Sequence, residues 1–371
     1  MFPSTSPETG RESWANGPRG GPVGPPPGPA PRGGGYPPVP GPPPGAPATP
    51  FDEPAADEQR EPETGRRRLR GKRGSDDPVP GSGLDPETDD EDEEEFEPVP
   101  IRRPLALAVA GFAGLLGLGL VLGAQTSGPG ARIPFALVVF GVQLLYILAW
   151  TMATRPPALP LVAGVAVAVA VGADAAAILP QVAALGPVGY VAAAGFVVGV
   201  LGQLVRRADR AQVTESLGAT LMVVIGVVAF ASLIVLSRLP LGTQAIFVCL
   251  AGSGVALVVA RLVDAVLPWP RLAPQVPRGA AGVVLGAMLG TLASGVIGGY
   301  VVGFTPTSGA VVGLVAATAA VLADLGVGYS EAGRLMAGEP PTMWVARHMQ
   351  GPLGGFALAA PAAYAMSVFF L

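Results

Sequence analysis

Beyond residue 100 the chain is a succession of apolar stretches, each about as long as a bilayer is thick. A helix needs about 20 apolar residues to cross roughly 30 Å of hydrocarbon. Nine stretches meet this requirement, namely Pro104–Ala124, Ile133–Ala153, Leu159–Leu179, Pro187–Val205, Ser216–Leu236, Leu241–Leu267, Gly279–Tyr300, Thr307–Leu325 and Leu353–Leu371. The strands of a β-barrel would alternate apolar and polar residues instead. Residues 101–371 are therefore expected to form an all-α, polytopic transmembrane helical bundle.

Residues 1–100 have a different composition. They are rich in proline and glycine, and they carry 10 basic and 20 acidic residues. Such a segment has too little apolar surface to form a core, so it is predicted to be a disordered cytosolic tail. Its basic cluster Arg66–Arg73 could contact anionic lipid headgroups, and its proline-rich pieces could bind protein partners. No folded or aromatic surface accompanies the basic cluster, which argues against nucleic-acid binding.

The arginines favour one topology. With the N-terminus in the cytosol, ten arginines of residues 101–371 fall in cytosolic segments and two, Arg132 and Arg238, fall in outer loops. Cytosolic loops of membrane proteins carry this excess of positive charge. The sequence therefore predicts a multi-pass protein of the plasma (inner) membrane with its C-terminus outside. The start, MFPSTSPETG, has no signal-peptide pattern, so the first span is expected to act as the targeting signal.

Small residues recur along the seventh predicted span. Gly279, Gly282, Gly286 and Gly290 lie three or four residues apart and so share one helix face. Faces of this kind let helix backbones approach closely in lipid, so tight packing is expected here. Cys249, the single cysteine, is expected to be a small buried apolar side chain.

Ionisable residues inside the spans are candidates for function, because they are costly to bury in a membrane. Asp174 lies in the third span, with Gln143 of the second span expected to join helices by hydrogen bonds. Arg261 and Asp264 are three residues apart and are expected to pair on one helix face. Asp324 is expected at the cytosolic end of the eighth span.

The connection between the last two spans, Gly328–Gly355, is long and polar, which is typical of functional loops. It contains Ser330, Arg334 and the single histidine, His348, and Asp324 precedes it. In order and spacing these residues resemble the catalytic loop of the CDP-diacylglycerol synthases, the phosphatidate cytidylyltransferases. The resemblance covers residues 213–371 and implies a transmembrane enzyme that moves a cytidylyl group from CTP to phosphatidate with Mg²⁺.

Most reactive positions of that family are changed in this chain. Gly333 stands for the first motif lysine, Glu339–Pro340 for the Lys-Asp pair and Leu353–Phe356 for the Asp-Arg-x-Asp box. The single lysine of the chain, Lys72, lies in the tail. Such transfer depends on neutralising phosphate charge, so these losses predict a pseudoenzyme without a cofactor. Asp324 would be a weak metal ligand, and Mg²⁺ would be needed only if activity remained.

The sequence therefore predicts a CDP-diacylglycerol synthase-like membrane protein that binds anionic phospholipid or partner proteins. Its candidate lipid-phosphate or vestigial site consists of Asp324, Ser330, Arg334, His348 and Arg278. Two alternatives stay open. One is an active phosphatidate cytidylyltransferase with rearranged site residues, and the other is an unrelated polytopic scaffold or transporter. A homodimer also stays open.

Overall fold

The computed structural model describes residues 102–127, 132–206, 210–340 and 342–370. These residues belong to one unit of the chain, Pro86–Leu371. The predicted tail, with its basic cluster and its expected protein partners, lies outside the described residues.

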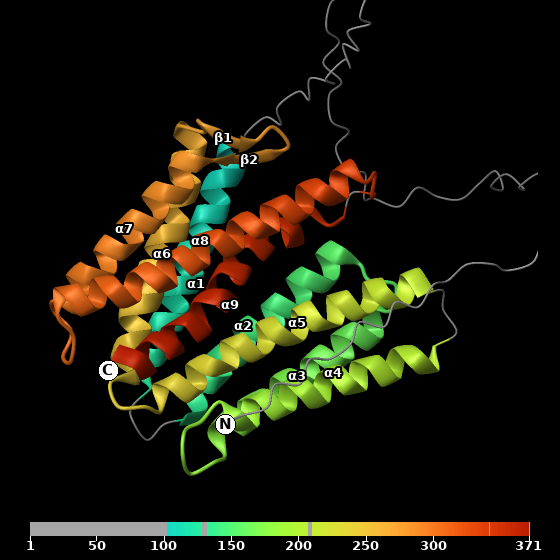
Figure 1. Ribbon diagram of the computed structural model, residues 1–371, viewed down its shortest axis with the longest axis horizontal. Coiled ribbons are helices and arrows are strands. Elements are labelled where there is room, and N and C mark those ends of the chain that lie inside the picture. Colours follow the sequence, from blue (N-terminus) through green and yellow to red (C-terminus); the bar gives the residue numbers. More distant parts are fainter. Residues whose placement is uncertain (1–101, 128–131, 207–209, 341, 371) are drawn as a thin grey trace, which may run out of the picture. The chain divides into compact units, whose positions relative to one another are not determined.

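The described part of the chain holds nine helices that are long and apolar enough to cross a membrane (Figure 1). They are α1 (Arg103–Thr126), α2 (Arg132–Thr154), α3 (Leu159–Ile178), α4 (Gly186–Val205), α5 (Arg210–Ser237), α6 (Gly242–Val266), α7 (Ala280–Gly298), α8 (Pro306–Met336) and α9 (Trp344–Phe370). The predicted transmembrane helical bundle is confirmed, with one helix for each apolar stretch.

The helices form two groups that are joined by α9 and also meet directly where α1 contacts α2 and α5 contacts α6. Helices α1, α6, α7 and α8 pack on one another, and α2, α3, α4 and α5 do the same. Helix α9 contacts α8, α6 and α1 of the first group and α5 and α2 of the second (Figure 1). The two groups therefore share α9 as a common wall.

A short antiparallel ribbon joins α6 to α7 and is the one β-sheet in the described residues. Its strands are β1 (Arg271–Ala273) and β2 (Val276–Gly279), with Arg271 opposite Gly279 and Ala273 opposite Val276. Strand β2 contacts α6, α7 and α8. The ribbon thus lies against the ends of the helices and carries Arg278 onto them.

The long polar connection expected over Gly328–Gly355 is mostly helix, so that expectation was wrong. Helix α8 continues to Met336, and α9 begins at Trp344. Gly338 ends α8 with a left-handed φ of 72°, the Glu339 N–H donates to the Arg334 carbonyl at 3.1 Å, and Pro340 follows. Glycine adopts this conformation without steric cost, and the proline that follows favours the end of the helix. Helix α8 therefore ends eleven residues beyond Leu325, the predicted end of the eighth span.

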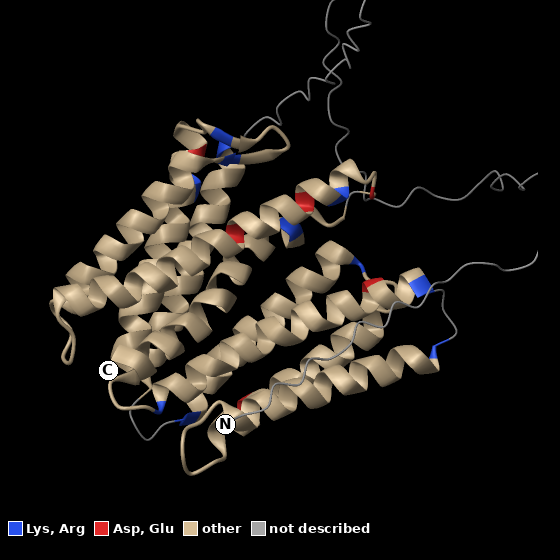
Figure 2. Ribbon diagram, in the orientation of Figure 1, with Lys and Arg blue, Asp and Glu red and all other residues tan. Residues whose placement is uncertain are grey.

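Charged residues gather at one set of helix ends, which we call the arginine-rich face (Figure 2). This face is formed by the starts of α1, α3, α5, α7 and α9, the ends of α2, α4, α6 and α8, and the ribbon. Among the described arginines, Arg132 and Arg238 lie at the opposite ends. Both donate to carbonyls at the C-terminus of α3, Arg132 to Ile178 at 3.2 Å and Arg238 to Ala177. Cations are favourable there, because helix C-termini carry partial negative charge.

The small residues of α7 pack against α6 as the sequence predicts. A Cβ atom on Gly286 would lie 2.6 Å from the carbonyl oxygen of Ala256, and one on Gly290 would lie 2.6 Å from that of Gly252. Backbones approach this closely only where side chains are absent. Cys249 of α6 is fully buried, which confirms that prediction too.

We expect Gly286→Leu to destabilise the protein by about 1–3 kcal/mol, because its side chain would overpack the contact between α6 and α7. Thermal unfolding of the detergent-solubilised protein measures the effect. Gly119→Leu is the matched control, since a Cβ there meets nothing within 4 Å. Equal melting temperatures for the two variants would contradict the tight packing.

Candidate functional site

Four charged residues form a buried ion cluster beneath the ribbon. Asp324 of α8 accepts from Arg261 of α6 through one carboxylate oxygen and from Arg278 of β2 through the other. The Arg278 Nε also lies 2.7 Å from the Asp264 Oδ2 of α6. The ion cluster therefore connects α6, β2 and α8, and its two arginines balance its two aspartates.

Arg278 is the centre of the ion cluster. Its side chain is 2 % exposed, and it lies between Asp264 and Asp324. Burial works against its charge, but Asp324 and Asp264 together raise the pKa of its guanidinium above the ordinary value. The Gly279 N–H donates to the Asp264 Oδ1 at 2.9 Å, which fixes the end of β2 to the same carboxylate.

Two glycines make room for the ion cluster. A Cβ on Gly351 of α9 would lie 2.0 Å from the Asp324 Oδ1, and one on Gly282 of α7 would lie 2.3 Å from the Asp264 Oδ1. Helices α7 and α9 therefore pass directly over the two carboxylates. Their glycine backbones seal the aspartates from the surroundings, which strengthens the ion pairs by lowering the local dielectric.

Two expectations about these residues were wrong. Arg261 forms its ion pair with Asp324 rather than with Asp264 of its own helix. The helix does not end near Asp324, as the predicted span did, because α8 continues for twelve residues beyond it, and Asp324 is 1 % exposed. In both cases a partner on a neighbouring element, invisible in the local sequence, decides where the side chain points.

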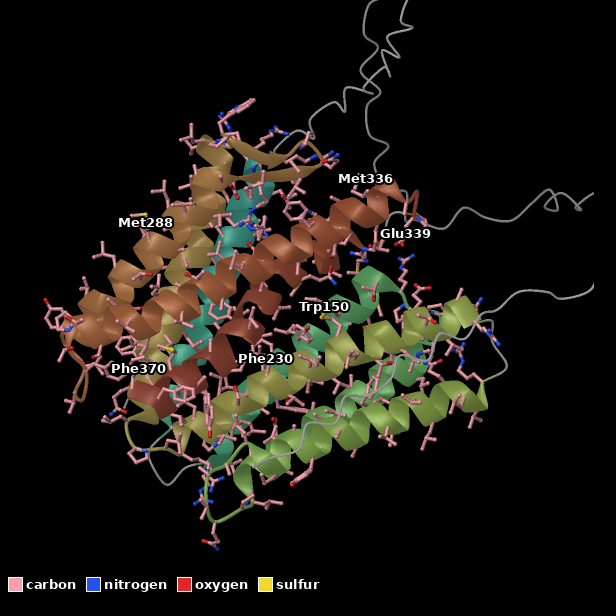
Figure 3. The ribbon with its side chains drawn as sticks, viewed as in Figure 1. Trp150, Phe230, Met288, Met336, Glu339 and Phe370 are labelled. Atoms are coloured by element: carbon pink, nitrogen blue, oxygen red, sulfur yellow. The ribbon has the colours of Figure 1, made fainter. Side chains whose placement is uncertain are left out.

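A cavity of about 730 Å³ lies between α2 and α5 on one side and α8 and α9 on the other. Figure 3 shows Trp150 in the space between these helices and Glu339 beyond the end of α8. Tyr146 and Trp150 of α2 stack on its wall with ring centroids 4.4 Å apart. Gly226 of α5 gives the Tyr146 ring its place, since a Cβ there would lie 2.1 Å from the ring.

One face of α8 lines the cavity and the adjacent face meets the ion cluster. The cavity residues of this helix are Ala323, Gly326, Val327, Ser330 and Arg334, which follow the helical spacing of three and four. Asp324, about 100° around the helix from Ala323, points away from the cavity to α6 and β2. The ion cluster and the cavity are therefore adjacent but separate.

The lining of the cavity is apolar along its length and polar at the arginine-rich face. Its charged residues are Glu215 near the start of α5, Arg334 near the end of α8, and Glu339. The Arg334 Nη1 donates to the Ala153 carbonyl at 2.9 Å, which holds the guanidinium at the end of α2. A guanidinium has five N–H donors, so Arg334 can also donate to a ligand. This arrangement suits a molecule with an apolar body and a polar head.

The five predicted site residues do not converge on one place. Arg334 and Ser330 line the cavity, whereas Asp324 and Arg278 belong to the ion cluster. His348 of α9 is half-buried, its Nδ1 lies 2.5 Å from the Trp344 carbonyl, and its ring meets the Trp344 ring edge-on. The role of each in binding stays a prediction.

Sequence reasoning missed the α2 and α5 walls of the cavity. Trp150, Glu215 and Gly218 lie in or next to apolar runs without any motif. Their one sequence signal is weak, since Glu215 is an acidic residue directly before the fifth predicted span.

The described residues contain no group of three histidine, cysteine, aspartate or glutamate side chains that could hold a metal ion. Both oxygens of Asp324 face guanidinium groups, so a metal ion would have to compete with Arg261 and Arg278. A metal role for Asp324 stays a prediction.

No protein-family model and no curated protein matches the chain.

We expect Asp324→Asn to destabilise the protein by about 3–5 kcal/mol, because it leaves the buried Arg278 and the half-buried Arg261 without full compensation. Thermal unfolding in detergent measures the loss. Glu331→Gln is the control, since it breaks a partly exposed ion pair with Arg347 and should cost about 0–1 kcal/mol. An Asp324→Asn melting temperature equal to that of the control would contradict a structural role for the ion cluster.

Proposed function

We propose that this chain is a non-catalytic membrane protein, related to the CDP-diacylglycerol synthases, that binds a phospholipid in the cavity. The acyl part would lie between α2, α5, α8 and α9, and the headgroup would lie at Arg334. The observation that carries this proposal is the distribution of the lining, which is apolar along the helices and charged only at the arginine-rich face.

The volume and the walls of the cavity fit such a ligand. Small-molecule sites in proteins measure about 300–1,000 Å³ and are mostly apolar with a few polar groups. The cavity of about 730 Å³ falls in this range, and the stacked pair of Tyr146 and Trp150 offers a flat surface to an acyl chain. An acyl chain in the bilayer is already out of water, so its binding depends on close packing against an apolar wall of this kind.

The charged end of the cavity favours a particular headgroup. The Arg334 guanidinium can donate two parallel hydrogen bonds to phosphate oxygens, and the Ser330 hydroxyl lies one helical turn away. Glu215 and Glu339 line the same end and accept hydrogen bonds rather than donate them. A headgroup with a phosphate and with N–H or O–H donors would satisfy both signs of charge.

The same lining argues against cytidylyl transfer. A triphosphate brings more negative charge than Arg334, the single cationic residue of the cavity in the described part of the chain, can neutralise. Asp324, the acid that the resemblance assigns to the metal, is held in the ion cluster. Turnover of CTP and phosphatidate by the purified protein with Mg²⁺ would overturn the non-catalytic part of the proposal.

The arrangement of arginines supports an orientation in the plasma membrane with the arginine-rich face in the cytosol. The two arginines at the opposite ends donate to the C-terminus of α3. Their position therefore has a local structural reason and does not weaken the charge bias.

We expect Gly326→Leu and Gly218→Leu to reduce co-purified phospholipid about tenfold, the change that 1.4 kcal/mol of lost affinity produces. Each glycine lines the cavity, and a Cβ on either meets nothing within 4 Å, so a leucine would fill the space without disturbing the walls. Native mass spectrometry of the detergent-solubilised protein measures the bound lipid. Gly141→Leu, at an equally open position outside the cavity, should bind lipid like the unmodified protein. Unchanged lipid in both cavity variants would contradict the proposal.

We expect Arg334→Gln to weaken binding of phospholipid by about tenfold or more, because a charge-assisted hydrogen bond to phosphate is lost. Binding of diacylglycerol, which has no phosphate, should hardly change. The measurement is competition between the two lipids in native mass spectra. Arg210→Gln removes the same charge from the same face without touching the cavity and should preserve the preference for phosphate.

A further inference from the structure

A second buried polar site lies in the other helix group, among α2, α3 and α5. Asp174 of α3 is 7 % exposed and Gln143 of α2 is 0 % exposed. The Gln143 Nε2 donates to the Asp174 Oδ1 at 2.8 Å and to the Val227 carbonyl of α5 at 3.1 Å. The two N–H groups of the amide are therefore both used, one for each neighbour.

Each residue also has one oxygen atom without a partner. These are the Gln143 Oε1 and the Asp174 Oδ2, both fully buried. The amide cannot be turned around to satisfy them, because both neighbours of its nitrogen are hydrogen-bond acceptors. An ionised Asp174 would thus leave two acceptors unsatisfied in the same apolar place, which is unfavourable.

No cationic side chain of the described residues forms an ion pair with Asp174. Two arginines lie at the C-terminal end of α3, but Arg132 and Arg238 donate to the carbonyls of Ile178 and Ala177. Helices α2, α4 and α5 pack on α3. These three helices carry Arg132, Arg210 and Glu215 near their N-terminal ends. Their other titratable side chains are Tyr146, which donates to the Met222 carbonyl, and Tyr190, which is exposed.

We propose that Asp174 binds a proton on Oδ2 and donates it to the Gln143 Oε1. The carboxylic acid and the amide then form a closed pair, with the amide N–H donating to one carboxyl oxygen and the carboxyl O–H donating to the amide oxygen. A hydronium ion of the aqueous phase supplies the proton: one of its O–H bonds breaks, an O–H bond forms on the Asp174 Oδ2, and a water molecule is released. This single proton satisfies both orphaned oxygens and removes a charge that nothing nearby balances.

This proposal places a proton-binding site in the α2–α5 group, formed by residues that belong neither to the cavity lining nor to the ion cluster. It does not rest on the proposed lipid binding, because none of the residues that line the cavity takes part in it. Intramembrane acids that bind protons are typical of proton-coupled membrane proteins, so Asp174 is the residue through which this chain would respond to protons.

The test is infrared difference spectroscopy of the purified protein at neutral pH, native minus Asp174→Asn. We expect the carbonyl stretch of a protonated carboxylic acid in the native protein and its loss in the variant. The variant should keep the native melting temperature, because its amide N–H₂ replaces the O–H donor to Gln143. The matched control is Glu331→Gln, whose difference spectrum should show the bands of an ionised carboxylate.

A second variant keeps the acid and removes its partner. In Gln143→Leu the acid band should move to higher frequency, because the carbonyl oxygen no longer accepts from the amide. Carboxylate bands in place of the acid band for Asp174 would overturn the proposal. So would a native melting temperature that rises with sodium or potassium ions while that of Asp174→Asn does not, since a bound cation would then balance an ionised Asp174.

Discussion

The ion pairs of Asp324 fix the rotation of α8 about its own axis, and this rotation decides which side chains of α8 face the cavity. Asp324 is bound to Arg261 of α6 and Arg278 of β2 on one side of α8. The helix must then present Ser330 and Arg334, on the adjacent side, to α2 and α5. Because a helix is rigid about its own axis, moving Asp324 out of the cluster would carry Arg334 away from the Ala153 carbonyl. The buried ion pairs of Asp324 thus set the position of Arg334 on the cavity wall.

Helix α9 packs on both helix groups and connects them. Its Gly351 lies against Asp324, and its Gly354 lies against the Trp150 ring, where a Cβ would be 3.2 Å away. On the first side it covers the ion cluster, and on the second it forms a wall of the cavity. Hydrophobic attraction between helices is absent in lipid, so such close contacts of small residues, with polar bonds between them, hold the groups together.

The sequence was sufficient for the parts of the fold that follow from the bilayer itself. Nine apolar runs became nine helices, and Gly286 and Gly290 met the α6 backbone as their spacing predicts. It was not sufficient in two places. The end of α8 is set by a local glycine cap at Gly338, which lies beyond the apolar run used to place the span, and Arg261 pairs with an aspartate 63 residues away rather than with one three residues away. The α2 wall of the cavity carries no motif, because any apolar helix with a correctly placed aromatic residue could supply it.

The ion cluster and the Asp174–Gln143 pair both contain buried carboxyl groups, and they offset the cost of that burial in different ways. The ion cluster contains as many arginines as aspartates, so its charges cancel, and the Gly279 N–H supplements them. Asp174 has an amide in place of an arginine, and an amide can satisfy a neutral acid but cannot balance a charge. The first site is therefore suited to holding α6, β2 and α8 in place. The second is suited to holding a proton, because an ionised Asp174 would be a buried charge that no cationic side chain of the described residues balances.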